Sequence, residues 1–397
     1  MSNQAKTNKR ILALDILRGI TIAGMILVNN PGSWAHIYAP LRHAEWNGLT
    51  PTDLVFPFFM FIMGISTYIS LMKYNFLFSS QALMKIVRRT VVIFLIGMAI
   101  GWFSRFCYYW AAAPEELSFF KNLWNSVWTF DRMRILGVMQ RLALCYCATS
   151  IVALTMKHKH IPYLIVALLL GYFILLMCGN GYVYGEGNVL SVVDRTVLTP
   201  AHMYKDNGIE PEGLLSTIPA IAHVLLGFYV GKLMFGKKKA DTNNSSSSLD
   251  QKLIILFLVG VILTFSGLLL SYGCPINKKI WSPTFVLTTC GFGSSLLALL
   301  IWIIDVKGYK KWSMFFESFG INPLFMYVLG GVLGILFGCI RFPWGEGTIS
   351  IHSFIYKVMY LSWLPETAAS LAYALTFVAI NWCIGYQLYK RKIYIKI

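Results

Sequence analysis

The chain has 397 residues, of which 57% are apolar and only 13% charged, and its mean hydropathy is +0.62. Soluble domains are about 45–50% apolar and about 25% charged, because their surfaces contact water. The composition therefore argues against disordered, nucleic-acid-binding and soluble enzyme classes and indicates an integral membrane protein. The formal net charge of +17 does not reverse this conclusion, because the basic residues cluster between apolar stretches, as in an oriented membrane protein.

We predict an all-α, polytopic membrane protein with about ten transmembrane helices in a single bundle. A span needs roughly 20 apolar residues. In chain order the predicted spans are 11–29, 53–73, 90–105, 135–156, 161–178, 214–235, 252–272, 284–305, 313–340 and 366–389. The third is short and is expected to extend outward through Phe106–Trp110. The ninth contains Asn322-Pro323 and Gly330-Gly331 and is expected to be kinked or broken there.

The distribution of basic residues predicts the orientation. With the N-terminus inside, 21 of the 34 Lys and Arg residues lie on the inner side and 11 on the outer side, so both termini are expected to be cytoplasmic. The outer connections are much longer and carry many aromatic and polar residues, so the chemistry is expected to face outward. The chain is read as a single transmembrane domain, 1–397, with 237–250 as a flexible cytoplasmic linker between two five-helix halves. The first span carries Asp15 and Arg18 and lacks a small-residue cleavage site, so no cleavable signal peptide is expected.

Charged residues within spans are costly and are generally paired or functional. Asp15 and Arg18 are three residues apart in the first span and can form an ion pair. This pair either fixes helix packing or places Arg18 to bind an anionic cofactor. Arg141, in the fourth span, has no obvious local partner, which favours a functional role.

The outer segment after the first span contains two candidates for catalysis. His43 can carry a proton near neutral pH, although a lone loop histidine is more often incidental. Asn29, at the outer end of the first span, has an amide that could stabilise an oxyanion. Thr50 and Asp53 are expected to cap the second helix.

Several blocks carry a resemblance along nearly the whole chain. They are Arg-Ile-Leu-Ala-Leu-Asp-Ile-Leu-Arg-Gly (10–19), the His-Ala-Glu-Trp-Asn-Gly-Leu block that begins at His43 and continues to Pro57, Gly-Val-Met-Gln-Arg (137–141), Val-Asp-Arg-Thr-Val-Leu (193–198), Glu-Pro-Glu-Gly-Leu-Leu-Ser-Thr-Ile (210–218), Asn-Lys-Lys-Ile-Trp-Ser-Pro-Thr-Phe-Val (277–286) and Gly-Ile-Asn-Pro-Leu (320–324). In these blocks the sequence resembles the heparan-α-glucosaminide N-acetyltransferase family and its bacterial homologues. The block at His43 is the most specific of them.

The resemblance implies transfer of an acetyl group from cytosolic acetyl-CoA to the amine of a terminal glucosamine on the extracytoplasmic side. The acceptor would be an amino sugar or a glycosaminoglycan fragment. The protein would lie in a bacterial inner membrane, with its active site open to the periplasm. His43 and Asn29 correspond to the family's active-site histidine and asparagine. We expect Arg18, Arg141 and Asp15 at the CoA site, and Glu212, Asp194, Trp46 and Asn47 at the acceptor site. Glu212 could equally cap a helix that begins near Gly213.

Two other functions remain open from the sequence. A transporter of amino sugars or oligosaccharides would also have many spans and a broken helix, and an O-acyltransferase of a cell-surface glycan would differ only in the acceptor. The eight cysteines form no metal-binding pattern, and we expect no metal and no nucleic-acid partner. Lipid bilayer surrounds the spans, and the oligomeric state, including a homodimer, is left open.

Overall fold

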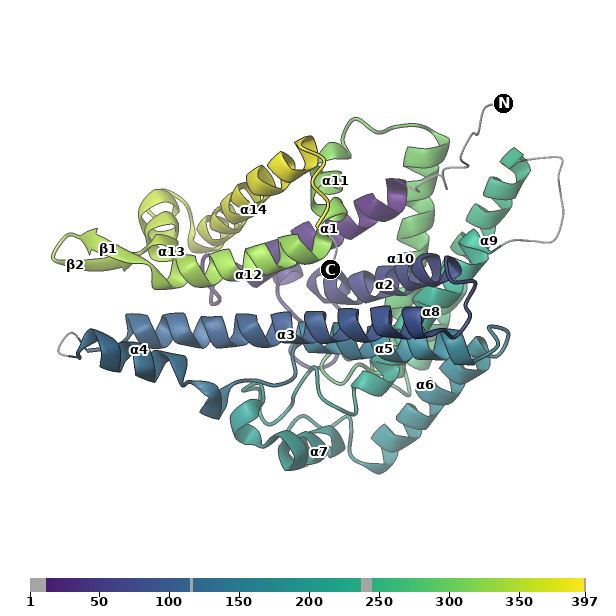
Figure 1. Cartoon of the computed structure of the whole chain (residues 1–397), viewed down its shortest axis with the longest axis horizontal. Helices are drawn as coiled ribbons and strands as arrows, with labels where there is room; N and C mark the ends of the chain where they lie inside the picture. The colour runs from purple at the N-terminus through teal and green to yellow at the C-terminus, as the bar shows by residue number, and fades with distance from the viewer. Residues whose placement is uncertain (1–11, 115–116, 237–244, 396–397) are drawn as a thin grey trace.

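The computed structural model describes residues 12–114, 117–236 and 245–395, which are helical over most of their length (Figure 1). The longer helices are α1 (Leu12–Asn29), α2 (Val55–Met72), α3 (Ser80–Ala111), α4 (Phe119–Val127), α5 (Val138–Thr155), α6 (Ile161–Cys178), α7 (Val189–Leu198), α8 (Thr217–Phe235), α9 (Ser245–Leu270), α10 (Pro283–Leu300), α11 (Met314–Ile321), α12 (Pro323–Cys339) and α14 (Glu366–Lys390). Figure 1 shows α11, α12 and α14 along one edge of the molecule and α4, α6 and α7 along the other. The prediction of an all-α polytopic membrane protein is confirmed.

Within the described residues, eight helices are long and apolar enough to cross a membrane, or nine if the bent pair α11 and α12 forms one span. These nine correspond to nine of the ten predicted spans. The remaining predicted span, 90–105, lies inside α3, which continues to Ala111. At its other end α3 begins at Ser80, because the Ser79 hydroxyl accepts a hydrogen bond from the Ala82 backbone N–H and caps the first turn.

The predicted break in the ninth span lies at Asn322, where α11 and α12 meet at 90°. Pro323 cannot donate a backbone hydrogen bond to the preceding turn, so the helix ends before it and a new helix starts. The Asn322 side chain donates to the Ile393 carbonyl and accepts from the Ile395 N–H, both at 2.8 Å. The C-terminal segment thus satisfies polar groups at the break. No second break occurs at Gly330-Gly331, which lie inside α12.

Two predicted connections contain regular structure. Residues 237–244 of the predicted linker lie outside the described residues, whereas 245–250 form the first turns of α9 instead of a flexible chain. The connection after α12 contains a short antiparallel hairpin, β1 (Arg341–Trp344) with β2 (Gly347–Ser350), followed by α13 (Ile351–Ser353) and the π-helical η6 (Phe354–Tyr360). The hairpin lies at the end of the molecule where α12 finishes (Figure 1).

Close helix packing holds α1 in the centre of the bundle. A Cβ added at Gly19 of α1 would lie 1.8 Å from the Phe316 carbonyl oxygen of α11, and one added at Gly320 would lie 1.9 Å from the Asp15 carbonyl oxygen. Only glycine allows two helix backbones to approach this closely. The largest apolar core surrounds the same region and is formed mainly by α1, α2, α5, α8 and α10. The N-terminal half of α1 is therefore packed closely against α11, and each end of α1 borders a cavity.

Candidate active site

A cavity of about 500 Å³ lies at the C-terminal end of α1 and contains His43 in its wall. We call it the histidine cavity. Its polar lining residues are Asn29, Arg42, His43, Glu45, Thr52, Asp53, Arg134, Tyr204, Lys205, Asp206, Glu212, Lys278, Lys279 and Tyr327. The predicted Asn29, His43 and Glu212 therefore meet in one cavity, although they come from distant parts of the chain.

Asp53 both caps a helix and orients His43. Its Oδ2 atom accepts hydrogen bonds from the Thr50 N–H and hydroxyl at 3.1 and 3.0 Å, which confirms the predicted cap. Oδ2 also accepts from the Ala44 N–H at 3.1 Å, and Oδ1 lies 2.6 Å from Nδ1 of His43. Because a carboxylate can only accept, this contact requires a proton on Nδ1, and in the neutral tautomer that it favours Nε2 is the acceptor. This is the arrangement that a general base requires.

Lys278 completes a three-residue cluster. Its Nζ atom lies 3.4 Å from Oδ1 of Asp53, and 3.0 and 3.5 Å from Nδ1 and Nε2 of His43. Burial lowers the pKa of the Lys278 ammonium, and the Asp53 carboxylate opposes this shift. The fully buried Asp53 carboxylate thus lies beside two groups that can carry a compensating positive charge.

Two loops are joined so that this cluster can form. The Gly48 N–H donates to the Ile276 carbonyl at 2.8 Å, and the Asn277 amide donates to Asn47 Oδ1 at 3.2 Å. Trp46 donates from Nε1 to the Tyr182 carbonyl at 2.8 Å. Neither Trp46 nor Asn47 lines the histidine cavity. The structure gives both residues a supporting role, and their predicted contact with substrate stays a prediction.

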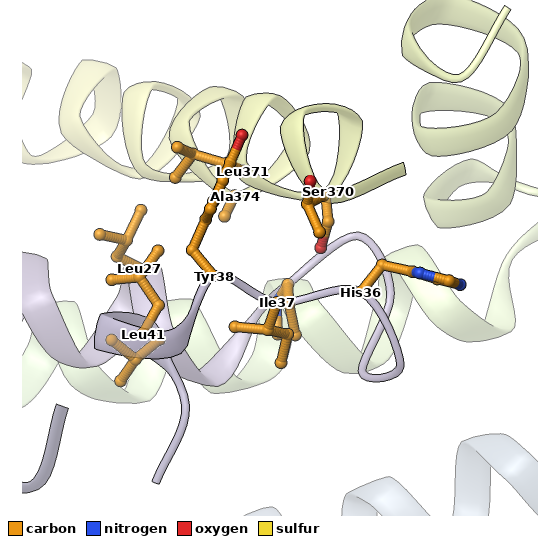
Figure 2. Close-up of a pocket in the computed structure, with 11 residues that line it drawn as sticks. Leu27, His36, Ile37, Tyr38, Leu41, Ser370, Leu371 and Ala374 are labelled. Atoms are coloured by element: carbon orange, nitrogen blue, oxygen red, sulfur yellow. The ribbon is translucent and has the colours of Figure 1, made fainter. Parts of the chain in front are cut away.

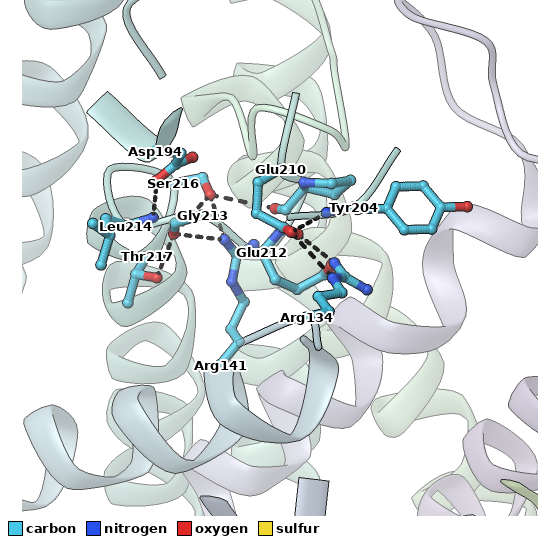
Figure 3. A network of polar contacts seen from close by, with 11 residues as sticks. Arg134, Arg141, Asp194, Tyr204, Glu210, Glu212, Gly213, Leu214, Ser216 and Thr217 are labelled. Atoms are coloured by element: carbon cyan, nitrogen blue, oxygen red, sulfur yellow. Dashed lines mark hydrogen bonds and ion pairs between the residues drawn. The ribbon is translucent and has the colours of Figure 1, made fainter. Parts of the chain in front are cut away.

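An ion-pair network that contains Glu212 also lines the histidine cavity (Figure 3). Arg134 pairs with both Glu210 and Glu212, and Glu210 also accepts from the Tyr204 N–H at 2.8 Å. Burial alone would lower the pKa of Arg134, but the carboxylates of Glu212 and Glu210 outweigh it and raise that pKa. Glu212 is thus a carboxylate that lines the cavity and is held by Arg134. The helix that it was alternatively predicted to cap near Gly213 is α8, which begins only at Thr217.

Asp194 and Arg141 lie behind this network and outside the histidine cavity (Figure 3). Asp194 is fully buried and its Oδ1 accepts from the Leu214 N–H at 2.8 Å. Arg141 is 1% exposed, donates to the Gly213 carbonyl at 3.3 Å and pairs with the Ser216 hydroxyl. Both side chains contact the 213–216 turn, which gives them a structural role. Their predicted contacts with substrate and CoA stay predictions.

A second cavity, of about 700 Å³, lies at the other end of α1. We call it the basic cavity, because its polar lining residues are Arg18, Ser66, Ser70, Lys85, Arg88 and Arg89. Arg18 donates to Asp15 and to Ser66, both at 2.8 Å. Arg18 thus lies where four cations meet, and Asp15 orients it.

Successive turns of the same helices line the two cavities. Phe56 of α2 borders the histidine cavity and Phe59 the basic cavity, and the same relation holds for Val138 and Leu142 of α5. On α12, Tyr327 borders the histidine cavity and Leu324 borders the basic cavity. Residues three or four apart lie on one helix face. Three helices therefore present a continuous face from one cavity to the other.

A recess between residues 36–41 and α14 is too small to matter for substrate binding. Figure 2 shows it beside Tyr38 and Leu371. It holds about 10 Å³, which is roughly the space of one water molecule.

Sequence reasoning missed three residues of the histidine cavity. Asp53 was assigned only a capping role, and Lys278 and Arg134 were given no role. The signal for Lys278 was its position in the Asn277–Lys279 block that carries the resemblance. No pattern in the sequence indicates that it contacts a histidine 235 positions earlier.

Comparison with known proteins assigns the family. The family model described as heparan-alpha-glucosaminide N-acetyltransferase, catalytic, matches residues 10–265, which include His43, Asp53, Arg134 and Glu212. The chain belongs to the heparan-alpha-glucosaminide N-acetyltransferase catalytic family. The family's members are named as N-acetyltransferases, which are acyltransferases.

Two curated members of this N-acetyltransferase family are similar to the chain. The human heparan-alpha-glucosaminide N-acetyltransferase is 28% identical over 371 residues, covering 80% of this chain and 52% of the human protein. The mouse protein of the same name is 26% identical over 440 residues, covering 98% of this chain and 60% of the mouse protein. The chain thus spans about half to three fifths of the length of these relatives.

Proposed function

We propose that the chain is a transmembrane acetyltransferase that moves an acetyl group from cytosolic acetyl-CoA to the amine of a terminal glucosamine on the extracytoplasmic side. The site would open to the periplasm of a bacterial inner membrane. The observation that carries this proposal is the pair of cavities at the two ends of α1, one basic and one built around an Asp-oriented histidine. Family membership supports the same reaction.

The basic cavity suits the phosphates of CoA. Arg18, Lys85, Arg88 and Arg89 line it, and guanidinium groups form paired hydrogen bonds with phosphate oxygens. Its apolar wall continues toward the histidine cavity along α2, α5 and α12. Both features fit a ligand with an anionic head and a long, narrow arm.

The length of that arm matches the distance to be crossed. Arg18 and Asn29 are 11 residues apart on α1, so they are separated by about 16 Å along the axis at 1.5 Å per residue. The pantetheine arm has as many backbone bonds as about four extended amino-acid residues, or roughly 14 Å. With its phosphates beside Arg18, the thioester would lie close to Asn29 and His43.

The reaction forms a C–N bond and breaks a C–S bond. Nε2 of His43 accepts a proton from the attacking amine and returns it to the departing thiolate, while Asp53 holds Nδ1–H. The Asn29 amide donates to the oxyanion of the tetrahedral intermediate. Glu212, which lines the same cavity, would anchor the acceptor's amino or hydroxyl groups.

The test is transfer by the purified protein. Incubation with acetyl-CoA and glucosamine should release free CoA thiol and form N-acetylglucosamine in equal amounts. A protein that neither releases CoA nor acetylates any amino sugar, but moves labelled sugar across a vesicle membrane, would instead be a transporter. Acetylation of a hydroxyl with no product on the amine would favour an O-acyltransferase.

A further inference from the structure

Lys278 places an amine of the protein itself beside His43. Its side chain lines the histidine cavity, and Nζ lies 3.5 Å from Nε2 of His43 and 3.4 Å from Oδ1 of Asp53. In the proposed mechanism the amine of the acceptor must also reach Nε2, because that nitrogen removes its proton. Lys278 and the acceptor therefore offer the same functional group to the same base.

The surroundings of Lys278 favour its uncharged form more than water does. The side chain is only 20% exposed. Burial lowers the pKa of the ammonium, and the Asp53 carboxylate opposes this shift. Only the neutral amine has a lone pair that can attack a carbonyl carbon, and a desolvated lysine reaches that form more readily than an exposed one.

Two other lysines line the same cavity, but their contacts differ. Lys279 pairs with Asp206 at 2.8 Å and lies over the ring of Tyr184, 4.9 Å from its centre. Lys205 is exposed. Among the described residues, Lys278 is the lysine of this lining that contacts His43. The other two lysines are therefore internal controls for any chemistry that depends on His43.

We propose that Lys278 is a self-acetylation site, which takes the acetyl group from bound acetyl-CoA when the acceptor is absent. This inference rests on the proposed function. The ammonium first loses one proton to solvent. The amine then attacks the thioester carbon, so that a C–N bond forms and the C–S bond breaks. The second proton passes through Nε2 of His43 to the departing thiolate, and CoA leaves as the free thiol.

The product stops further turnover. An amide is much less reactive than a thioester, so the acetyl group stays on Nζ. Its formation removes the ammonium and leaves the buried Asp53 carboxylate with His43 as its remaining cationic neighbour. The acetyl group also fills the space beside Nε2 that the acceptor's amine needs. Acetyl-CoA alone thus inactivates the protein, and the acceptor protects it.

The test is incubation of the purified protein with isotopically labelled acetyl-CoA, with and without saturating glucosamine. Mass spectrometry of the digested protein should find the label on Lys278 when glucosamine is absent, and on neither Lys205 nor Lys279. Transfer activity should fall in proportion to the acetylated fraction of Lys278, and glucosamine should suppress both changes. His43→Ala should slow the acetylation of Lys278 by about 10²- to 10⁴-fold, because the base is lost.

Lys278→Arg separates chemical modification from loss of charge. Arginine keeps a positive charge beside Asp53 but stays protonated and cannot be acetylated in this way. Preincubation with acetyl-CoA should lower the transfer rate of the wild-type protein. It should leave the rate of the Lys278→Arg protein at the value that this variant shows without preincubation.

Three results would overturn self-acetylation while leaving the proposed function intact. They are an unmodified Lys278 in a protein that acetylates glucosamine, equal labelling of all three lysines, and labelling of Lys278 that is as fast in His43→Ala as in the wild type. A protein that binds CoA but acetylates neither glucosamine nor Lys278 would overturn both the inference and the proposed function.

Discussion

His43 is held by contacts that leave it one reactive nitrogen. Asp53 lies 2.6 Å from Nδ1 and itself accepts three further hydrogen bonds, so its position is fixed by the start of α2. The half-exposed imidazole therefore combines a rigid orientation with access to the cavity. Catalytic groups work best when a second residue fixes them in this way.

Replacing His43 with Ala removes the proposed base. Transfer should fall by about 10²- to 10⁴-fold, the usual contribution of general base catalysis, while CoA binding stays close to wild type. The measurement is steady-state acetylation of glucosamine alongside a CoA binding isotherm. His160→Ala is the matched control, because His160 is exposed, lies between α5 and α6 and lines neither cavity. Full activity in a folded His43→Ala protein would contradict the mechanism.

Asp194 gives a prediction about stability and pH. Burial raises the pKa of its carboxyl from 3.8 to about 6, although the Leu214 N–H opposes this shift. The folded protein therefore favours the protonated Asp194 carboxyl more than the unfolded chain does. The free energy of unfolding should fall by about 3 kcal/mol in total as the pH rises from about 4 through about 6. Asp194→Asn stays neutral and should raise the unfolding temperature at pH 7.5. The gain should shrink as the pH falls through 6 and vanish near 4. An equal rise in unfolding temperature at pH 7.5 and at pH 4 would contradict the raised pKa of Asp194.

At the scale of elements, the N-terminal half of α3 supplies three of the four cations that line the basic cavity. Lys85, Arg88 and Arg89 lie within five residues of one another and all line the basic cavity. Arg89 also stacks on Tyr146, at 4.8 Å from the ring centre. Arg88 has no ion pair among the described residues, so its removal leaves no carboxylate unpaired.

Arg88→Gln should weaken CoA binding by about 10-fold, because one charged hydrogen bond to phosphate is lost. The effect should diminish at high salt, which screens this exposed charge. Isothermal titration with CoA measures both. Lys157→Gln removes an exposed cation that follows α5 and does not line the cavity, and this variant should bind CoA normally. Equal loss in both variants would mean that only net charge matters.

Helices and their breaks could be predicted where a local sequence pattern determines them. The apolar stretches marked the spans, and Pro323 marked the break between α11 and α12 because proline ends a helix by its own covalent structure. The helical start of α9 and the β1–β2 hairpin were not predicted, since polar segments of this kind take their structure from the surrounding fold. His43 and Asn29 were predicted from short motifs, and both line the histidine cavity. The contact between Lys278 and His43 depends on the pairing of Gly48 with Ile276, which no local pattern encodes.

At the scale of the whole molecule, the proposed mechanism requires the two cavities to open at opposite faces of the membrane. Cysteine labelling tests this arrangement in a background where the exposed Cys178 and Cys383 are replaced by serine. A cysteine at Ser245 should react only from the cytoplasmic side and one at Ser33 only from outside. Reaction of both from the same side would reject the topology.

The most direct test of the account is transfer across a sealed membrane. Protein is reconstituted in vesicles with acetyl-CoA confined to the side of the basic cavity and glucosamine to the side of the histidine cavity. We expect N-acetylglucosamine to appear only on the glucosamine side, with free CoA on the other, and His43→Ala vesicles to form neither. If product forms only when both substrates share one side of the membrane, acetyl transfer through the bundle is wrong.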